Sequence, residues 1–152
     1  MLIVLLDALT LGLDSDLSIF EKYGELKIYS TTNKSETLDR IEFADIVISN
    51  KVVLGKEEIA YSKKLKLICV SATGYNNIDL ISAKENGIVV CNVKNYSTES
   101  VAQHTFALML ALQNSLFENI SDVRNGYWAK SPIFTMINHP FNEISGKTIG
   151  VI

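Results

Sequence analysis

The chain has 152 residues, 47% of them hydrophobic, so it can bury roughly two-thirds of the surface that its unfolded form exposes. Its 14 basic and 17 acidic residues give a net charge of -3, and no basic cluster favours a nucleic-acid partner. The apolar runs are far shorter than the roughly 20 residues of a membrane span, and no secretion signal is visible at the N-terminus. We therefore expect a cytoplasmic protein.

Short apolar runs rich in β-branched residues alternate with helical or polar segments along the first part of the chain. Strands that alternate with helices are typical of a parallel sheet covered on both faces. The sequence therefore predicts an α/β fold. The expected strands are Leu2–Leu6, Leu26–Tyr29, Ile46–Ser49, Leu67–Val70 and Ile88–Cys91.

A short helix is predicted before the last of these strands, over Ile78–Glu85. Asn76 and Asn77 are placed to cap its start. Gly87 stands where a left-handed residue commonly ends a helix.

A longer helix is predicted from about Ser100 to Glu118, because apolar residues recur there at helical spacing. Ser100 and Gln103 form a capping-box pattern at its head. The turns that follow lead to Gly146–Ile152, which is typical of the strand that opens a dinucleotide-binding fold. We therefore expect one domain over residues 1–99 and a second part over residues 100–152.

The two cysteines, Cys69 and Cys91, fall inside predicted buried strands. Thiols in such places usually behave as small, reduced hydrophobic groups. No cysteine or histidine spacing typical of a metal site is present, so we expect neither a disulfide nor a metal.

The most specific segment for chemistry is the loop after the fourth predicted strand, which contains Ala72, Thr73 and Gly74. Ligands of open parallel sheets bind at the carboxyl ends of strands, and glycine lets backbone N–H groups approach an anion closely. The loop is thus placed to bind a carboxylate. An ordinary βα turn without a ligand remains an alternative.

With these features, the sequence resembles the D-isomer-specific 2-hydroxyacid dehydrogenases along nearly its whole length, and most of all their glycerate dehydrogenase or hydroxypyruvate reductase branch. The resemblance is carried by four stretches: SATGYNNIDL (71–80), AKENGIVVCNVKNYSTESVAQHTFALML (83–110), NGYW (125–128) and ISGKTIGVI (144–152).

The resemblance implies a flavodoxin-like substrate-binding domain and a long helix that crosses to an NAD-binding Rossmann domain. It implies that Thr73 and Gly74, beside Ala72, offer main-chain donors to the substrate carboxylate. It places Thr105 near the nicotinamide of NAD. It also implies a homodimer, to which the segment around Trp128 contributes.

The family's catalytic arginine, glutamate and histidine belong to sequence beyond Ile152, so the resemblance assigns no catalytic residue to this chain. His104 is expected to be packed or interfacial, and His139 lies in a loop before Pro140. We therefore expect an inactive N-terminal part of an NAD-dependent enzyme that reduces hydroxypyruvate or a similar 2-keto acid.

Three other functions are alternatives for an α/β chain of this kind. A receiver-like phosphoacceptor module would have Asp7, Thr73 and Lys94 at strand ends, but Ser49 and Asn50 stand where it needs an aspartate. A flavin-binding module is disfavoured by the first loop, which has one glycine. A dehydrogenase-like binding or regulatory protein without catalysis remains open.

Overall fold

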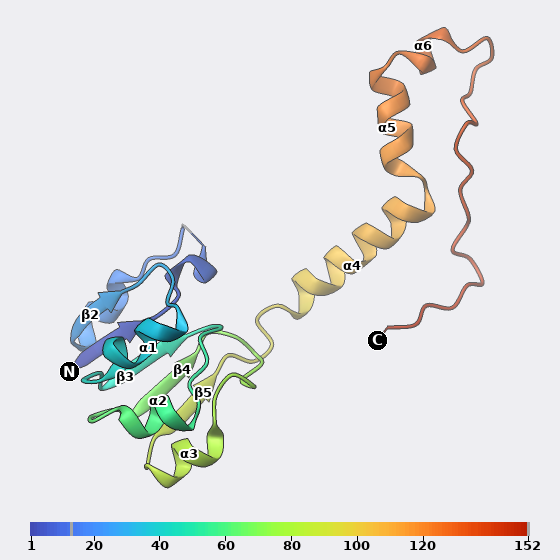
Figure 1. Ribbon diagram of the computed structural model, residues 1–152. Coiled ribbons are helices and arrows are strands. Elements are labelled where there is room, and N and C mark those ends of the chain that lie inside the picture. Colours follow the sequence, from blue (N-terminus) through green and yellow to red (C-terminus); the bar gives the residue numbers. More distant parts are fainter. Residues whose placement is uncertain (13, 152) are drawn as a thin grey trace. The chain divides into compact units, whose positions relative to one another are not determined.

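The computed structural model describes residues 1–12 and 14–151. Its first compact unit, Met1–Tyr96, contains a five-stranded parallel sheet with the order β2-β1-β3-β4-β5 (Figure 1). The strands are β1 Leu2–Leu5, β2 Glu25–Ile28, β3 Ile46–Ser49, β4 Leu67–Val70 and β5 Val89–Asn92. Each predicted strand is confirmed to within about one residue at either end, and the strand order is that of flavodoxin-like folds.

The connecting segments are distributed over both faces of the sheet. The β1–β2 crossover runs in the opposite direction from the three later ones, so right-handed crossovers place it on the opposite face. One face carries the helices α1 Lys34–Ile41, α2 Lys56–Tyr61 and α3 Leu80–Glu85, which contribute Ile41, Ile59 and Ala83 to the larger buried cluster. The other face carries the 3₁₀ helices η1 Ala8–Leu11 and η2 Ser18–Tyr23, over Ile3, Leu5 and Ile48.

The burial of β4 and β5 corrects one expectation. Cys69 on β4 is half-buried, but Cys91 on β5 is exposed. Strand β5 lies at the edge of the sheet, and Val89, two residues before Cys91 on the same face of the strand, is 58% exposed. The prediction that Cys91 is buried was therefore wrong, because the strand pattern does not reveal which strand is at the edge.

The start of α3 also differs from the prediction. The residue that caps it is Asp79, whose Oδ1 accepts a hydrogen bond from the Ser82 N–H at 2.9 Å. Asn77 is used elsewhere: its side-chain amide donates to the carbonyl of Val52 at 3.0 Å. Gly87 has the expected left-handed conformation, with a φ of +69°.

The second compact unit, Ser97–Ile152, contains α4 Thr98–Gln113, α5 Leu116–Arg124 and α6 Tyr127–Lys130. The single helix predicted over 100–118 is thus two helices, separated at Ser115, which is left-handed with a φ of 46°. Asn114 turns its side-chain amide back to the Leu110 carbonyl at 2.8 Å, and such local bonds compete with a continuing helix. The helix begins after Ser97, because the Val101 N–H donates to the Ser97 carbonyl.

The two units divide between Tyr96 and Ser97, close to the expected boundary between residues 99 and 100. Residues 146–151 form no strand with any described part of the chain, and a strand requires a neighbour to pair with. The expected opening strand of a dinucleotide-binding fold is therefore not present among these residues. None of the described helices has the length and apolar character needed to cross a membrane.

Candidate functional site

The candidate site lies at the carboxyl edge of the sheet, where Asp7 holds two loops together. Asp7 follows β1 and is 5% exposed. Its carboxylate accepts hydrogen bonds from the N–H groups of Asn50 at 2.9 Å and Lys51 at 2.7 Å, with a longer contact of 3.4 Å from Val52. A buried carboxylate is stabilised by such amide donors. The bonds fix the loop after β3 against the end of β1.

Asn77 and Asn92 extend this support to the loop after β4. The side-chain amide of Asn77 reaches the loop after β3 at the Val52 carbonyl. On the other side, the amide of Asn92, the last residue of β5, donates to the Thr73 carbonyl at 2.8 Å. The loop after β4 is thus bonded to the loop after β3 on one side and to β5 on the other. This is the arrangement expected of a preorganised binding loop.

Within this loop, the structure distinguishes the three predicted substrate-binding residues. Ala72 is 6% exposed, and its carbonyl accepts a hydrogen bond from the Val93 N–H at 3.1 Å. Thr73 and Gly74 are exposed, and among the described residues no acceptor is bonded to either of their N–H groups. The Thr73 and Gly74 N–H groups thus have no acceptor among these residues, whereas the Ala72 carbonyl is bonded within the fold.

Two buried polar atoms at the same edge have no partner among the described residues. They are Oδ1 of Asn50, after β3, and Oγ of Ser71, after β4. Buried polar atoms nearly always have a hydrogen-bond partner. Such atoms are commonly satisfied by a buried water molecule.

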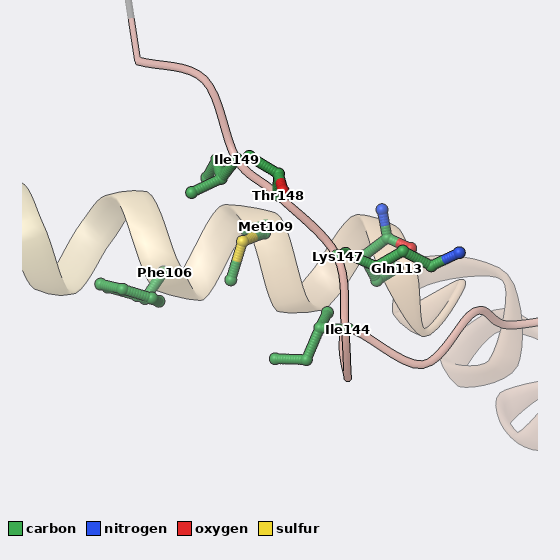
Figure 2. Close-up of a pocket in the computed structure, with 7 residues that line it drawn as sticks. All are labelled: Phe106, Met109, Gln113, Ile144, Lys147, Thr148 and Ile149. Carbon is green, nitrogen blue, oxygen red and sulfur yellow. The ribbon is translucent and has the colours of Figure 1, made fainter.

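A separate hollow lies within the second unit, between α4 and the C-terminal segment, with a volume of about 310 Å³. Figure 2 shows its lining side chains, which come from Phe106, Met109, Gln113, Ile144, Lys147, Thr148 and Ile149. The lining is mostly apolar. Thr105, the predicted cofactor residue, is not part of it; Thr105 is exposed and its hydroxyl donates to the Val101 carbonyl at 2.8 Å.

The described residues do not by themselves form a cradle for NAD. A pyrophosphate site of the Rossmann type needs glycines that lead directly into a helix N-terminus, and residues 146–151 lead into no described helix. Both histidines of the chain belong to the second unit. His104 is exposed on α4, so it is not packed within this chain, and the expectation that it is packed or interfacial now rests on an interface; His139 Nε2 is 2.9 Å from Asp122 Oδ2 within the second unit.

Sequence reasoning missed the supporting role of Asp7 and Asn92. The sequence suggests Asp7 as the phosphoacceptor of a receiver-like module, but its carboxylate is occupied by backbone amides. The signal was available: a lone acid directly after a buried strand requires donors from neighbouring loops. Asn92 carried no such signal, because its partner Thr73 is 19 residues away.

Comparison with known proteins identifies the family to which the chain is similar. Residues 3–135 match the family model for the D-isomer specific 2-hydroxyacid dehydrogenase, catalytic domain. The chain is 36% identical to a hydroxypyruvate reductase of Blautia hydrogenotrophica, over 100% of the chain and 48% of that protein. It is also 36% identical to a glycerate dehydrogenase of Methylorubrum extorquens, over 93% of the chain and 45% of that protein.

A comparison with solved structures agrees with this family match. The chain is similar to D-lactate dehydrogenase from Aquifex aeolicus, complexed with NAD and lactic acid, with a TM-score of 0.66 and 27% identity over 82% of the chain and 37% of that protein. The chain thus spans less than half the length of these relatives. From the match of the family model over most of its residues, the chain belongs to the D-isomer specific 2-hydroxyacid dehydrogenase family.

Proposed function

We propose that this chain is the substrate-binding part of an NAD-dependent D-2-hydroxyacid dehydrogenase that interconverts hydroxypyruvate, or a similar 2-keto acid, and the D-2-hydroxy acid. The main-chain N–H groups of Thr73 and Gly74 bind the substrate carboxylate. Thr105 lies beside the nicotinamide when the cofactor is bound. Residues 1–99 act as the substrate domain, and residues 100–152 lead into the NAD-binding domain.

One observation carries the proposal: the N–H groups of two exposed residues, Thr73 and Gly74, have no acceptor among the described residues, and they follow β4 in a loop supported from both sides. Backbone donors that need no reorganisation bind an anion more strongly than mobile ones. Hydride transfer to a 2-keto acid also places negative charge on the carbonyl oxygen, which requires a proton donor and a cation. The family's arginine and histidine would supply these, so the chain alone is expected to bind but not to reduce.

Gly74→Ala tests the carboxylate contact. A Cβ at Gly74 would meet only Oδ1 of Asn76, at the ordinary distance of 3.5 Å, so the fold should be retained while the methyl group obstructs approach to the amide. We expect D-glycerate to shift the Thr73 and Gly74 amide resonances of the 152-residue chain in a saturable way, and the variant to weaken this binding about tenfold or more.

Two controls make this experiment specific. Gly150→Ala, at which an added Cβ meets nothing within 4 Å, should bind D-glycerate like the wild type. Glycerol, which lacks the carboxylate, should leave both resonances in place. Equal shifts with glycerol, or no saturable shift up to about 50 mM, well above the usual KM range, would reject a main-chain carboxylate site.

Catalysis is tested on the whole product of the gene that contains this chain. Loss of NADH absorbance with hydroxypyruvate supports the dehydrogenase, and Gly74→Ala should lower kcat/KM about tenfold or more. Absence of turnover with common 2-keto acids, combined with retained D-glycerate binding, would instead favour a dehydrogenase-like binding or regulatory protein. The 152-residue chain alone should show no saturable NADH binding at micromolar concentration.

We further propose that the protein is a cytoplasmic homodimer. The support for the dimer is the second unit, whose helices expose large apolar side chains, among them Leu112 at 73% and Phe117 at 65%. An unusual number of large exposed apolar side chains on one unit favours a protein interface there.

A further inference from the structure

The two cysteines of the chain are direct neighbours across the sheet. Cys69 on β4 and Cys91 on β5 are paired in the parallel register. Adjacent strands are about 4.8 Å apart, which lies inside the range of about 4.4 to 6.8 Å between the Cα atoms of a disulfide. Paired residues point to the same face of a sheet. Here that face is the one opposite the buried Ile68 and Val70.

The two thiols differ in accessibility. Cys91 is exposed, and it contributes with Tyr75 and Leu80 to the lining of a cavity of about 100 Å³. Cys69, on the neighbouring strand, is half-buried. Burial raises the pKa of the Cys69 thiol, and the neighbouring Cys91 raises it further. An oxidant from solution therefore reaches Cys91 first, and Cys69 is positioned to react second.

We propose that Cys69 and Cys91 form a modification site: a dithiol that a peroxide converts reversibly into an intramolecular disulfide. The Cys91 thiolate attacks hydrogen peroxide, the O–O bond breaks, and Cys91 becomes a sulfenic acid while hydroxide leaves and is protonated to water. The Cys69 thiolate then attacks the Cys91 sulfur, the S–O bond breaks, and a second water is released. The dithiol loses two electrons and two protons, which reduce the peroxide.

Closure requires a small movement that the edge strand allows. The Cβ atoms of a disulfide approach to about 3.5 to 4.5 Å, slightly less than the strand spacing. Strand β5 has a neighbour on one side only, so it can shift toward β4 without displacing another strand. The disulfide would form one residue before Asn92, which supports the Thr73 loop.

The experiment uses the full 152-residue chain and hydrogen peroxide as the probe. The sequence contains two cysteines, and trypsin separates them into the peptides 67–84 and 85–94. After peroxide treatment and alkylation of free thiols, we expect the two peptides joined by a disulfide, and restored as separate alkylated peptides by dithiothreitol. Oxidation of Cys91 to the sulfinic or sulfonic acid, with Cys69 still free to be alkylated, would overturn the proposal.

A comparison with the unfolded chain shows whether the fold is responsible. The same dilute protein in urea keeps both thiols but loses their register, and we expect it to form the disulfide at least about tenfold more slowly than the folded chain. Equal rates would overturn the proposal. In Cys69→Ser, the sulfenic acid at Cys91 should persist and be trapped by dimedone, and its absence there and in the folded wild type would contradict the first step.

Discussion

Asp7 illustrates how one side chain can position a binding loop without touching the ligand. Its carboxylate joins the end of β1 to a loop 43 to 45 residues away through backbone amides. The same loop then holds Asn77, and through it the segment beyond Gly74. Asp7 is therefore a positioning residue for the proposed site.

We expect Asp7→Ala to lower the free energy of unfolding by roughly 3 kcal/mol. The substitution removes the buried Asp7 carboxylate that accepts from the part-buried N–H groups of Asn50 and Lys51, and the loss of several hydrogen bonds to one charged group is costly. Urea denaturation followed by circular dichroism measures the change. The matched control is Asp39→Ala on α1, where an exposed acid should change stability by less than about 0.5 kcal/mol. An equal effect of both variants would show that the amide bonds contribute little.

The strands could be predicted because their apolar, β-branched runs mark burial locally, as in β3 and β4, whose ends agree with the prediction. The start of α3 could not, because several nearby residues can cap equally well. Asn76, Asn77 and Asp79 are all good caps by residue type. The structure uses Asp79 because the amide of Asn77 is bound to Val52.

The cap of α3 gives a pH-dependent contribution to stability. The backbone N–H of Ser82, then its hydroxyl, donate to Asp79 and lower the pKa of that carboxyl. The folded pKa is thus below the unfolded one, so the stabilisation is present at neutral pH and is lost as the pH falls from about 4, the ordinary aspartate range, through the folded pKa.

We therefore expect Asp79→Ala to lower the urea midpoint at neutral pH and to approach the wild type at pH values below the folded pKa of Asp79. Urea titrations of both chains across this range measure the difference. Asp39→Ala again serves as the control, since its effect should not follow this profile. A difference between Asp79→Ala and the wild type that stays constant throughout the range would show that the ionised cap is not the cause.

The two helices of the second unit show the same limit of local patterns. Apolar periodicity continues through Asn114 and Ser115, so it predicts one helix. The break depends on hydrogen bonds that the periodicity does not encode, including that from the Ser115 hydroxyl to the distant Pro140 carbonyl at 2.9 Å. Residue type gave a hint, since asparagine and serine often bond to nearby backbone.

At the scale of the whole chain, the location of the candidate site was predictable from topology. Parallel strands bring their carboxyl ends to one edge, so a glycine-containing loop after β4 had to lie there. The need of Asp7 for donors was predictable, but the partners of Asp7 and Asn92 were not, because they lie far away in sequence. Which loops these two side chains can reach is known only when the strand order is known.

The distribution of apolar surface between the two units bears on assembly. Within Met1–Tyr96, the large apolar side chains form two buried clusters around the sheet. Within the described part of Ser97–Ile152, Ala111 is the buried hydrophobic residue, while Leu112, Phe117 and Phe134 are exposed. Exposed apolar surface on this scale favours association, because burial contributes about 25 cal/mol per Å².

We expect the protein to form dimers through this unit, and Leu112→Glu to raise the dimer dissociation constant at least about tenfold, since it places a charge in the proposed apolar interface. Light scattering after size-exclusion chromatography over a dilution series measures the constant. Gln103→Glu is the matched control, because it adds the same charge at an exposed polar position of α4. A wild-type protein that remains monomeric at all concentrations, or equal effects of the two substitutions, would refute an interface at Leu112.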